Sequence, residues 1–182
     1  MENFNEFRET VSGLFNDHGG DLYGGEAITQ ERHGLQCAQL AENEDAPPYL
    51  IVSALLHDVG HLLHDEFEQA QARGEDRFHE NLGSKFLDQW FGPEVTDPIK
   101  LHVASKKYLC ATQPDYFASL SPASVHTLRI QGGPMTQQEV AEFEKLPGYK
   151  DAIKVRLWDD TGKDPDMQTQ SLDHFLAYAD RI

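Results

Sequence analysis

Apolar residues recur along this chain at spacings of three and four, which place them on one face of an α-helix. The spacing predicts helices over residues 3–17, 27–43, 47–63, 79–91 and 94–110. After residue 110, prolines and a Gly-Gly-Pro run divide the chain into shorter helices, including 136–144, 148–158 and a last one from Ser171. Alternation of period two is nearly absent, so no sheet is expected. The pattern therefore predicts an all-α helical bundle, with residues 1–182 in a single domain.

Two segments interrupt the helical pattern before residue 80. A Gly-rich stretch covers residues 19–26, and an acidic, polar loop is expected over 65–77. Pro47 and Pro48 mark the start of the third helix, because proline is well accommodated in a first helical turn.

The charge of the chain narrows the classes of partner. There are 31 acidic residues against 15 lysines and arginines, a formal charge of −16. Nucleic acids and anionic membranes bind clustered basic residues, so neither is expected as a partner. A small anionic substrate stays compatible with this charge, because bound metal ions reverse the field around them.

Location and topology follow from what the sequence lacks. Its first residues show neither the basic nor the apolar region of a signal peptide. The longest apolar run, Tyr49–Leu56, is too short to span a bilayer. Cys37 and Cys110 are interpreted as reduced thiols. We therefore expect a cytoplasmic protein without a membrane segment.

The most informative motif is His57-Asp58-Val59-Gly60-His61. His57 and His61 are four residues apart and share a helical face, with a kink expected at Gly60. A His-Asp pair is common by chance and is often only surface polarity. Here it directly follows the apolar run that ends at Leu56, so ionisable groups emerge from the core and need a partner or a metal.

Further histidines recur at regular intervals on separate predicted helices. His33 lies 24 residues before His57, His79 lies 22 after it, and His102 a further 23. Asp159 ends the late segment Val155-Arg-Leu-Trp-Asp159. Any single histidine of this kind is more often a hydrogen-bonded core residue, but side chains projecting inward from several helices are typical of metal sites in bundles. Imidazole and carboxylate together suit iron, manganese, zinc or magnesium.

The set His33, His57-Asp58, His79, His102 and Asp159 resembles the metal ligands of HD-domain diiron oxygenases, a group that includes myo-inositol oxygenase. The resemblance is closer to the organophosphonate oxygenase (PhnZ-like) family and extends from Tyr23 to Lys163. It includes Tyr23-Gly-Gly-Glu-Ala-Ile28, His102-Val-Ala-Ser-Lys-Lys-Tyr-Leu109, Thr127-Leu-Arg-Ile-Gln-Gly-Gly-Pro-Met135 and Trp158-Asp-Asp-Thr-Gly-Lys163.

The resemblance implies a single HD domain with two iron ions, Fe²⁺ and Fe³⁺, bridged by Asp58. It implies O₂ and a small phosphonate as substrates, with residues 19–26 covering the site. The implied catalytic residues are Tyr23, His61 and Lys106, and the implied substrate contacts are Glu26, Gly24, Ser124 and Gln131. Glu26 also fits a helix-dipole role, and Ser124 and Gln131 fit cap or turn roles equally well.

One position departs from the family pattern and bears on the substrate. The Tyr-x-Gly-Glu segment of the family has a bulky aliphatic residue at x, where this chain has Gly24. The missing side chain widens the expected pocket near the amine. We therefore favour (R)-1-hydroxy-2-(trimethylammonio)ethylphosphonate over the primary amine 1-hydroxy-2-aminoethylphosphonate, giving phosphate and glycine betaine instead of phosphate and glycine.

Two other functions stay open at the level of the sequence. An HD-type phosphohydrolase of a nucleotide or phosphate ester would use the same ligands without O₂. A metal-binding module without catalysis would not need Lys106, His61 or Glu26. The oligomeric state is unknown.

Overall fold

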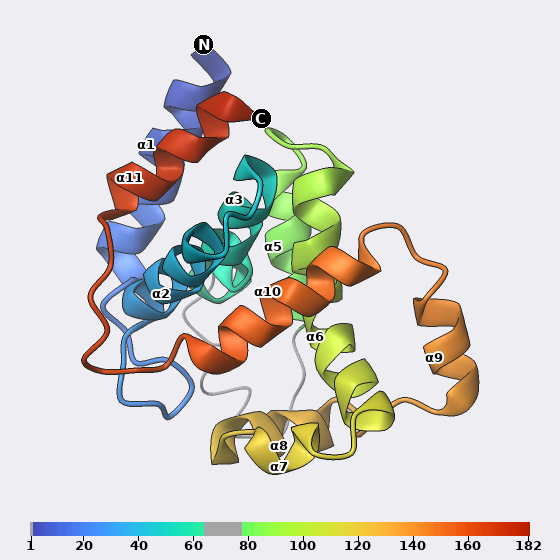
Figure 1. Ribbon diagram of the computed structural model, residues 1–182. Coiled ribbons are helices and arrows are strands. Elements are labelled where there is room, and N and C mark those ends of the chain that lie inside the picture. The colour runs from blue at the N-terminus through green and yellow to red at the C-terminus, as the bar shows by residue number, and fades with distance from the viewer. Residues whose placement is uncertain (1, 64–77) are drawn as a thin grey trace.

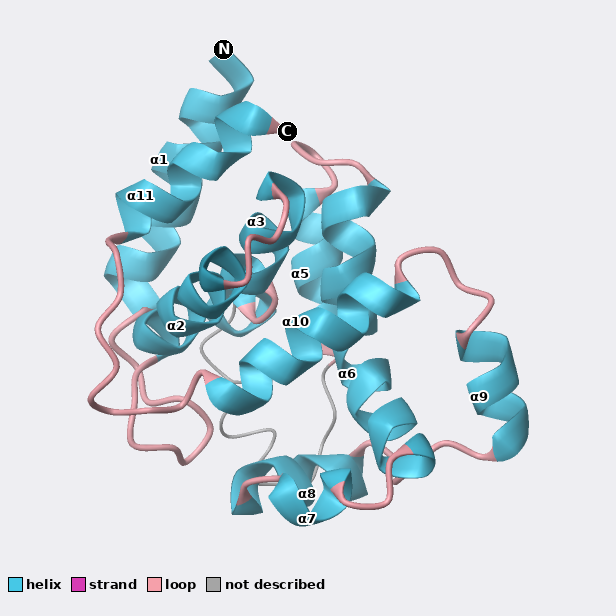
Figure 2. Cartoon of the chain, viewed as in Figure 1, coloured by secondary structure: helices cyan, strands magenta, loops and turns pink. Residues whose placement is uncertain are grey.

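The computed structural model describes residues 2–63 and 78–182, which form a helical bundle (Figures 1 and 2). In these ranges an isolated bridge between Leu22 and Thr29 is the only strand-like pairing, so the all-α prediction is confirmed. The elements are α1 (Glu2–His18), α2 (Gln30–Asn43), α3 (Pro48–Leu56), the 3₁₀ helix η1 (Val59–Leu63), α5 (His79–Leu87), α6 (Pro93–Thr112), α7 (Tyr116–Ser119), α8 (Pro122–Ile130), α9 (Gln137–Phe143), α10 (Tyr149–Thr161), α11 (Leu172–Leu176) and the 3₁₀ helix η2 (Ala177–Arg181).

The core is built around α3. Seven consecutive residues of this helix, from Leu50 to Leu56, are buried, as expected for a helix that is apolar on all sides. Helices α2, α6 and α10 pack against it, and α10 crosses the middle of the bundle in Figure 1. Phe7, Val11 and Phe15 of α1 belong to the same core cluster. In the described ranges, no helix combines the length and apolar character that crossing a bilayer requires.

Helix α2 begins three residues later than predicted. Its N-cap is Thr29, whose hydroxyl accepts a hydrogen bond from the Arg32 amide at 3.2 Å. Ahead of it, the Tyr23 amide donates to the Ile28 carbonyl at 2.9 Å. Residues 27 and 28 therefore belong to the Gly-rich loop, because local cap chemistry competes successfully with helix continuation.

The third predicted helix is in fact divided. Helix α3 ends at Leu56, His57 is its C-cap, and the chain continues as the tighter η1. The predicted fourth helix also ends early, at Leu87 instead of residue 91, before the turn that leads to α6. The acidic loop expected over 65–77 lies outside the described residues.

Gly60 is the reason why η1 and α5 approach so closely. A Cβ atom at this position would lie 2.1 Å from the His79 carbonyl oxygen. A Cβ on Gly83 of α5 would lie 3.1 Å from the Gly60 amide nitrogen. Two glycines thus let the two backbones touch, and this contact brings His79 beside the His57-Asp58 pair.

We expect Gly60→Ala to destabilise the fold by roughly 2 kcal/mol or more, because α5 must move away to admit the methyl group. The measurement is the free energy of unfolding from urea titration. Gly13→Ala is the control: its Cβ would meet no atom within 4 Å, and alanine is the better helix former. A Gly60→Ala protein as stable as Gly13→Ala would contradict the close approach.

Candidate metal centre

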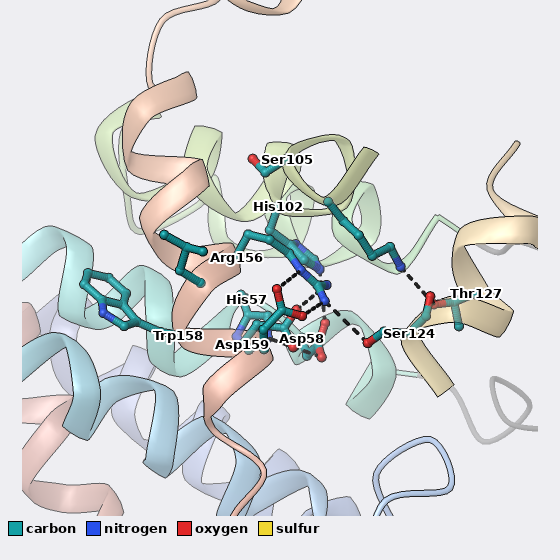
Figure 3. A network of polar contacts seen from close by, with 12 residues as sticks. His57, Asp58, His102, Ser105, Ser124, Thr127, Arg156, Trp158 and Asp159 are labelled. Atoms are coloured by element: carbon teal, nitrogen blue, oxygen red, sulfur yellow. Dashed lines mark hydrogen bonds and ion pairs between the residues drawn. The ribbon is translucent and has the colours of Figure 1, made fainter. Parts of the chain in front are cut away.

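Six side chains from five segments converge at the centre of the bundle. They are His33 of α2, His57 and Asp58 at the end of α3, His79 at the start of α5, His102 of α6 and Asp159 of α10. His33, His57, His102 and Asp159 are almost completely buried. Figure 3 shows His57, Asp58, His102 and Asp159 close together beneath α6. The structure thus brings together all six residues predicted as ligands.

A first group of donor atoms surrounds one oxygen of Asp58. His33 Nε2 lies 3.2 Å from His57 Nε2 and 3.4 Å from Asp159 Oδ1. His57 Nε2 lies 3.3 Å from Asp58 Oδ2. Ligands bound at about 2.0–2.2 Å from one ion are roughly 3 Å from each other. These four side chains therefore have the spacing of a metal-binding set.

A second group surrounds the other oxygen of Asp58. His79 Nε2 lies 3.1 Å from Asp58 Oδ1 and 3.2 Å from His102 Nε2. His102 Nε2 lies 3.4 Å from the same Asp58 oxygen. His61 is next to this group: its ring stacks on His79 at 4.1 Å, and its Nε2 is 3.9 Å from Asp58 Oδ1. Asp58 thus faces one group with each of its two oxygens.

Backbone contacts orient the imidazole rings toward these groups. His33 Nδ1 is 2.8 Å from the Gly162 carbonyl, His57 Nδ1 is 2.8 Å from the Ala54 carbonyl, and His102 Nδ1 is 2.7 Å from the Ile99 carbonyl. A carbonyl only accepts, so each Nδ1 donates, and Nε2 is the nitrogen left to bind a metal ion. Lone pairs and carboxylate oxygens gathered in a buried site fit a bound cation, with carbonyls that fix the ring tautomer.

The pKa values reflect the same crowding. Burial acts against protonation of His57, but Asp58 and Asp159 raise its pKa to about 9. Burial lowers the pKa of His102 to about 4. Burial opposes ionisation of Asp58, yet His57, His102 and His79 hold its pKa well below the usual range. An ion bound here displaces a proton at His57 and meets a neutral imidazole at His102.

Asp159 has its own set of neighbours. Arg156 Nη1 donates to Asp159 Oδ2 at 2.6 Å, and Lys163 Nζ lies 3.4 Å from Oδ1. The Tyr23 hydroxyl donates to Oδ1 at 3.2 Å, and the Tyr23 ring stacks on His33 at 3.8 Å. The Gly-rich loop is therefore attached to the first group of ligands through Tyr23.

Three basic side chains, Lys106, Arg156 and Lys163, lie beside the ligands, and we call this group of side chains the cationic pocket. Lys106 is buried, and its ammonium donates to Thr127 Oγ1 at 2.8 Å. The hydroxyl of Ser124 accepts from Arg156 Nη2 and Lys163 Nζ, each at 3.4 Å. Burial, and then Arg156, lower the pKa of Lys106 to about 7. Three cations thus gather in an otherwise acidic protein, which favours an anionic ligand.

Sequence reasoning missed Arg156, Lys163 and Thr127 as pocket residues. The signal was present in two of them, because Arg156 precedes Asp159 by three residues and Lys163 follows it by four, both helical spacings. Thr127 gave no such signal. It is brought to Lys106 only by the packing of α8 beside α6.

The remaining predicted site residues lie in loops or at helix ends. Gly24 has a φ of +48°, and a Cβ there would meet no atom within 4 Å. The Oε1 atom of Glu26 is buried without a hydrogen-bond partner in the described structure, and so is Oε1 of Gln131, the C-cap of α8. No hydrogen bond or ion pair among the described residues joins the Glu26 or Gln131 side chain to the ligands, and their roles stay predictions.

The family model for the HD domain matches residues 31–182. The chain is 45% identical over 174 residues to the [1-hydroxy-2-(trimethylamino)ethyl]phosphonate dioxygenase (glycine-betaine-forming) of Leisingera caerulea, covering 96% of this chain and 89% of that protein. It is 44% identical over 171 residues to the hydroxymethylphosphonate dioxygenase of Gimesia maris, covering 92% and 85%.

A third relative has no assigned activity in its name. It is the uncharacterized protein L432 of Acanthamoeba polyphaga mimivirus, 32% identical over 177 residues, with 96% of this chain and 81% of that protein covered. The matches to the two named dioxygenases cover most of both chains. The chain belongs to the HD-domain family and, within it, to the phosphonate dioxygenase (PhnZ-like) group.

Proposed function

We propose that this chain is an O₂-dependent oxidoreductase that cleaves the C–P bond of a small 1-hydroxyphosphonate at a pair of iron ions. The observation that carries the proposal is Asp58, with one oxygen in each of two histidine groups and the Lys106 pocket beside them. Oxygenase chemistry on phosphonates is what the names of two relatives state.

Two ions would be held by this chain's own residues. His33, His57, Asp58 and Asp159 would bind the first, and Asp58, His79 and His102 the second. Histidine nitrogens with carboxylate oxygens suit iron. When bound, an Fe²⁺/Fe³⁺ pair supplies O₂ activation and electron transfer, while the protein supplies position and charge.

The cationic pocket gives the phosphonate a place next to the metals. Lys106 and Lys163 provide charge, and the hydroxyls of Thr127 and Ser124 accept hydrogen bonds from them. His61 stacks on His79 and can donate to a substrate oxygen. Burial strengthens each of these contacts, because water no longer competes for the anion. These residues would thus orient the phosphonate group beside the proposed metal ligands.

For the organic part of the substrate we favour (R)-1-hydroxy-2-(trimethylammonio)ethylphosphonate, converted to phosphate and glycine betaine. Gly24 leaves open space on the Gly-rich loop, and Glu26 on the same loop supplies a carboxyl group. Tyr23 contributes little to binding of the trimethylammonium group, because its ring already contacts His33 and lies 5.7 Å from Lys163 Nζ. Selection then rests on volume and charge.

A metal-dependent phosphohydrolase would use the same ligands with water as the nucleophile. Consumption of O₂ separates the two functions. The absence of nucleic-acid and membrane partners and the cytoplasmic location stay predictions.

Anaerobic reconstitution with Fe²⁺ should load two ions per chain, counted by elemental analysis. After partial oxidation, the loaded protein should take up O₂ and release phosphate from the trimethylated substrate in equal amounts. His79→Ala should retain the first ion, lose or weaken the second and stop turnover, because His102 is then the only proposed histidine ligand left beside Asp58 Oδ1.

His126→Ala is the control for the loss of a histidine, since His126 on α8 is outside the ligand set. A wild-type protein that binds a single ion would refute the paired site. Phosphate release from phosphate esters without O₂ uptake would favour the phosphohydrolase.

Lys106→Ala should raise the KM for the phosphonate by about tenfold or more, because it removes a buried charge-assisted contact. Lys107→Ala is the matched control on the same helix. The pKa of Lys106 is near 7, below the ordinary lysine value, so its charge is complete at lower pH and is lost as pH rises through that value. We therefore expect kcat/KM to fall on the alkaline side, and Lys106→Arg to move that limb upward. Equal effects of Lys106→Ala and Lys107→Ala would contradict the pocket.

A side chain at position 24 should penalise the trimethylated substrate more than the primary amine. Gly24→Leu fills the open space, but any side chain there is strained by the φ of +48°. Gly25→Leu controls for strain, because Gly25 also has a positive φ, +86°, and no neighbour within 4 Å. The measurement is kcat/KM for both substrates in all three proteins. A wild-type preference for the amine, or an equal loss with both substrates in Gly24→Leu, would overturn the assignment.

A further inference from the structure

Among the described residues, Asp160 is a carboxylate beside the cationic pocket that does not belong to the metal ligands. It lies on α10 directly after Asp159, and it binds Arg156 through both oxygens. Arg156 Nε donates to Asp160 Oδ2 at 3.1 Å, and Arg156 Nη2 donates to Asp160 Oδ1. Such a two-point contact fixes the plane of the guanidinium as well as its position. Arg156 is buried, so this restraint acts where water does not compete.

Tyr116 of α7 completes the restraint from another part of the chain. Its hydroxyl donates to Asp160 Oδ2 and accepts from Arg156 Nε at 3.1 Å. The tyrosine is itself buried. One edge of the guanidinium is therefore held on two sides, by an acid four residues along its own helix and by a hydroxyl from α7.

The other side of the same guanidinium faces the site. Nη1 donates to Asp159 Oδ2 at 2.6 Å, and Nη2 reaches Ser124 Oγ at 3.4 Å. Figure 3 shows both contacts running from Arg156 toward Asp159 and Ser124. A guanidinium is rigid and planar, so fixing one edge fixes the other. We propose that Asp160 is a positioning residue: it holds Arg156 in the orientation in which the guanidinium contacts Asp159 and faces the cationic pocket.

Charge gives Asp160 a second effect on the pocket. The groups that face Lys106 are Thr127 of α8, His79 of α5, Cys110 on its own helix, Arg156, Asp159 and Asp160 of α10, and Lys163. Of the two described carboxylates in this group, Asp159 is shared with the proposed metal ligands, and Asp160 is left to balance the cations. Its charge acts to raise the pKa of Lys106. Removal of that charge should make Lys106 lose its proton at a lower pH.

The test rests on the proposed function and compares Asp160→Asn with Asp151→Asn. Asp151 is a close match: it lies on α10, accepts a hydrogen bond from the Tyr49 hydroxyl at 3.0 Å, and faces Lys154 at 3.5 Å, all outside the pocket. We expect Asp160→Asn to raise the phosphonate KM by about tenfold and to move the alkaline limb of kcat/KM to lower pH. Asp151→Asn should change neither, although both variants lose a tyrosine contact.

Two further variants separate charge from packing. Tyr116→Phe removes the hydroxyl but keeps the carboxylate, so its alkaline limb should stay where the wild type has it. Asp160→Glu keeps the negative charge, so its alkaline limb should lie closer to that of the wild type than the limb of Asp160→Asn does. If Tyr116→Phe moves the limb as far as Asp160→Asn, or if Asp160→Asn matches the wild type in both KM and pH profile, the positioning role is overturned.

The affinity for inorganic phosphate, measured by calorimetry, tests the inference without turnover. Protonation of phosphate itself is the same for all variants, so differences in affinity come from the protein. Weaker binding to Asp160→Asn than to wild type or Asp151→Asn supports the positioning role. If phosphate binds more weakly to Asp160→Asn than to the other two proteins, but the wild type does not consume O₂ with phosphonates, the proposed function fails and the inference stands. Equal phosphate binding by all three proteins overturns the inference alone.

Discussion

The burial of the Asp58 carboxylate is the constraint on which the rest of the structure depends. An ionised carboxylate inside a helical bundle is unfavourable unless cations or donors surround it. Here it follows the most apolar helix, α3, and neighbouring histidine nitrogens lie at 3.1 to 3.4 Å from its two oxygens. Those nitrogens come from α3, α5 and α6, so the carboxylate sets how these helices are arranged. The metal ions proposed here supply the positive charge that such a centre requires.

The same logic explains how a chain with a formal charge of −16 selects an anion. The net charge acts over the surface and is screened by salt, whereas Lys106 and Arg156 act inside the protein at short range. Each of these cations has a fixed partner, Thr127 for Lys106 and Asp160 for Arg156. The pocket is therefore organised by local pairing, and the overall composition says little about it.

Much of the fold could be predicted from the sequence, because it depends on apolar residues at helical spacing. The six proposed ligands were predicted in another way: His57-Asp58 from its position after the apolar run, and the full set from the histidines on separate helices and from the family resemblance. The division of the third helix was not foreseen, since it depends on the contact between Gly60 and the His79 backbone. The partners of Lys106 and Arg156 were also missed, because Thr127 and Tyr116 approach them only through tertiary packing.

Helix α1 packs against the bundle although it lies outside the segment matched by the HD family model. The matched HD segment begins at residue 31, yet the Phe7 ring meets the Phe91 ring edge-on at 4.9 Å and the Trp90 ring at 5.6 Å. The packed core is thus larger than the matched family segment, because Phe7, Val11 and Phe15 of α1 belong to it. Residues 31–182 taken alone would therefore leave Trp90 and Phe91, which lie between α5 and α6, without the ring that now packs against them.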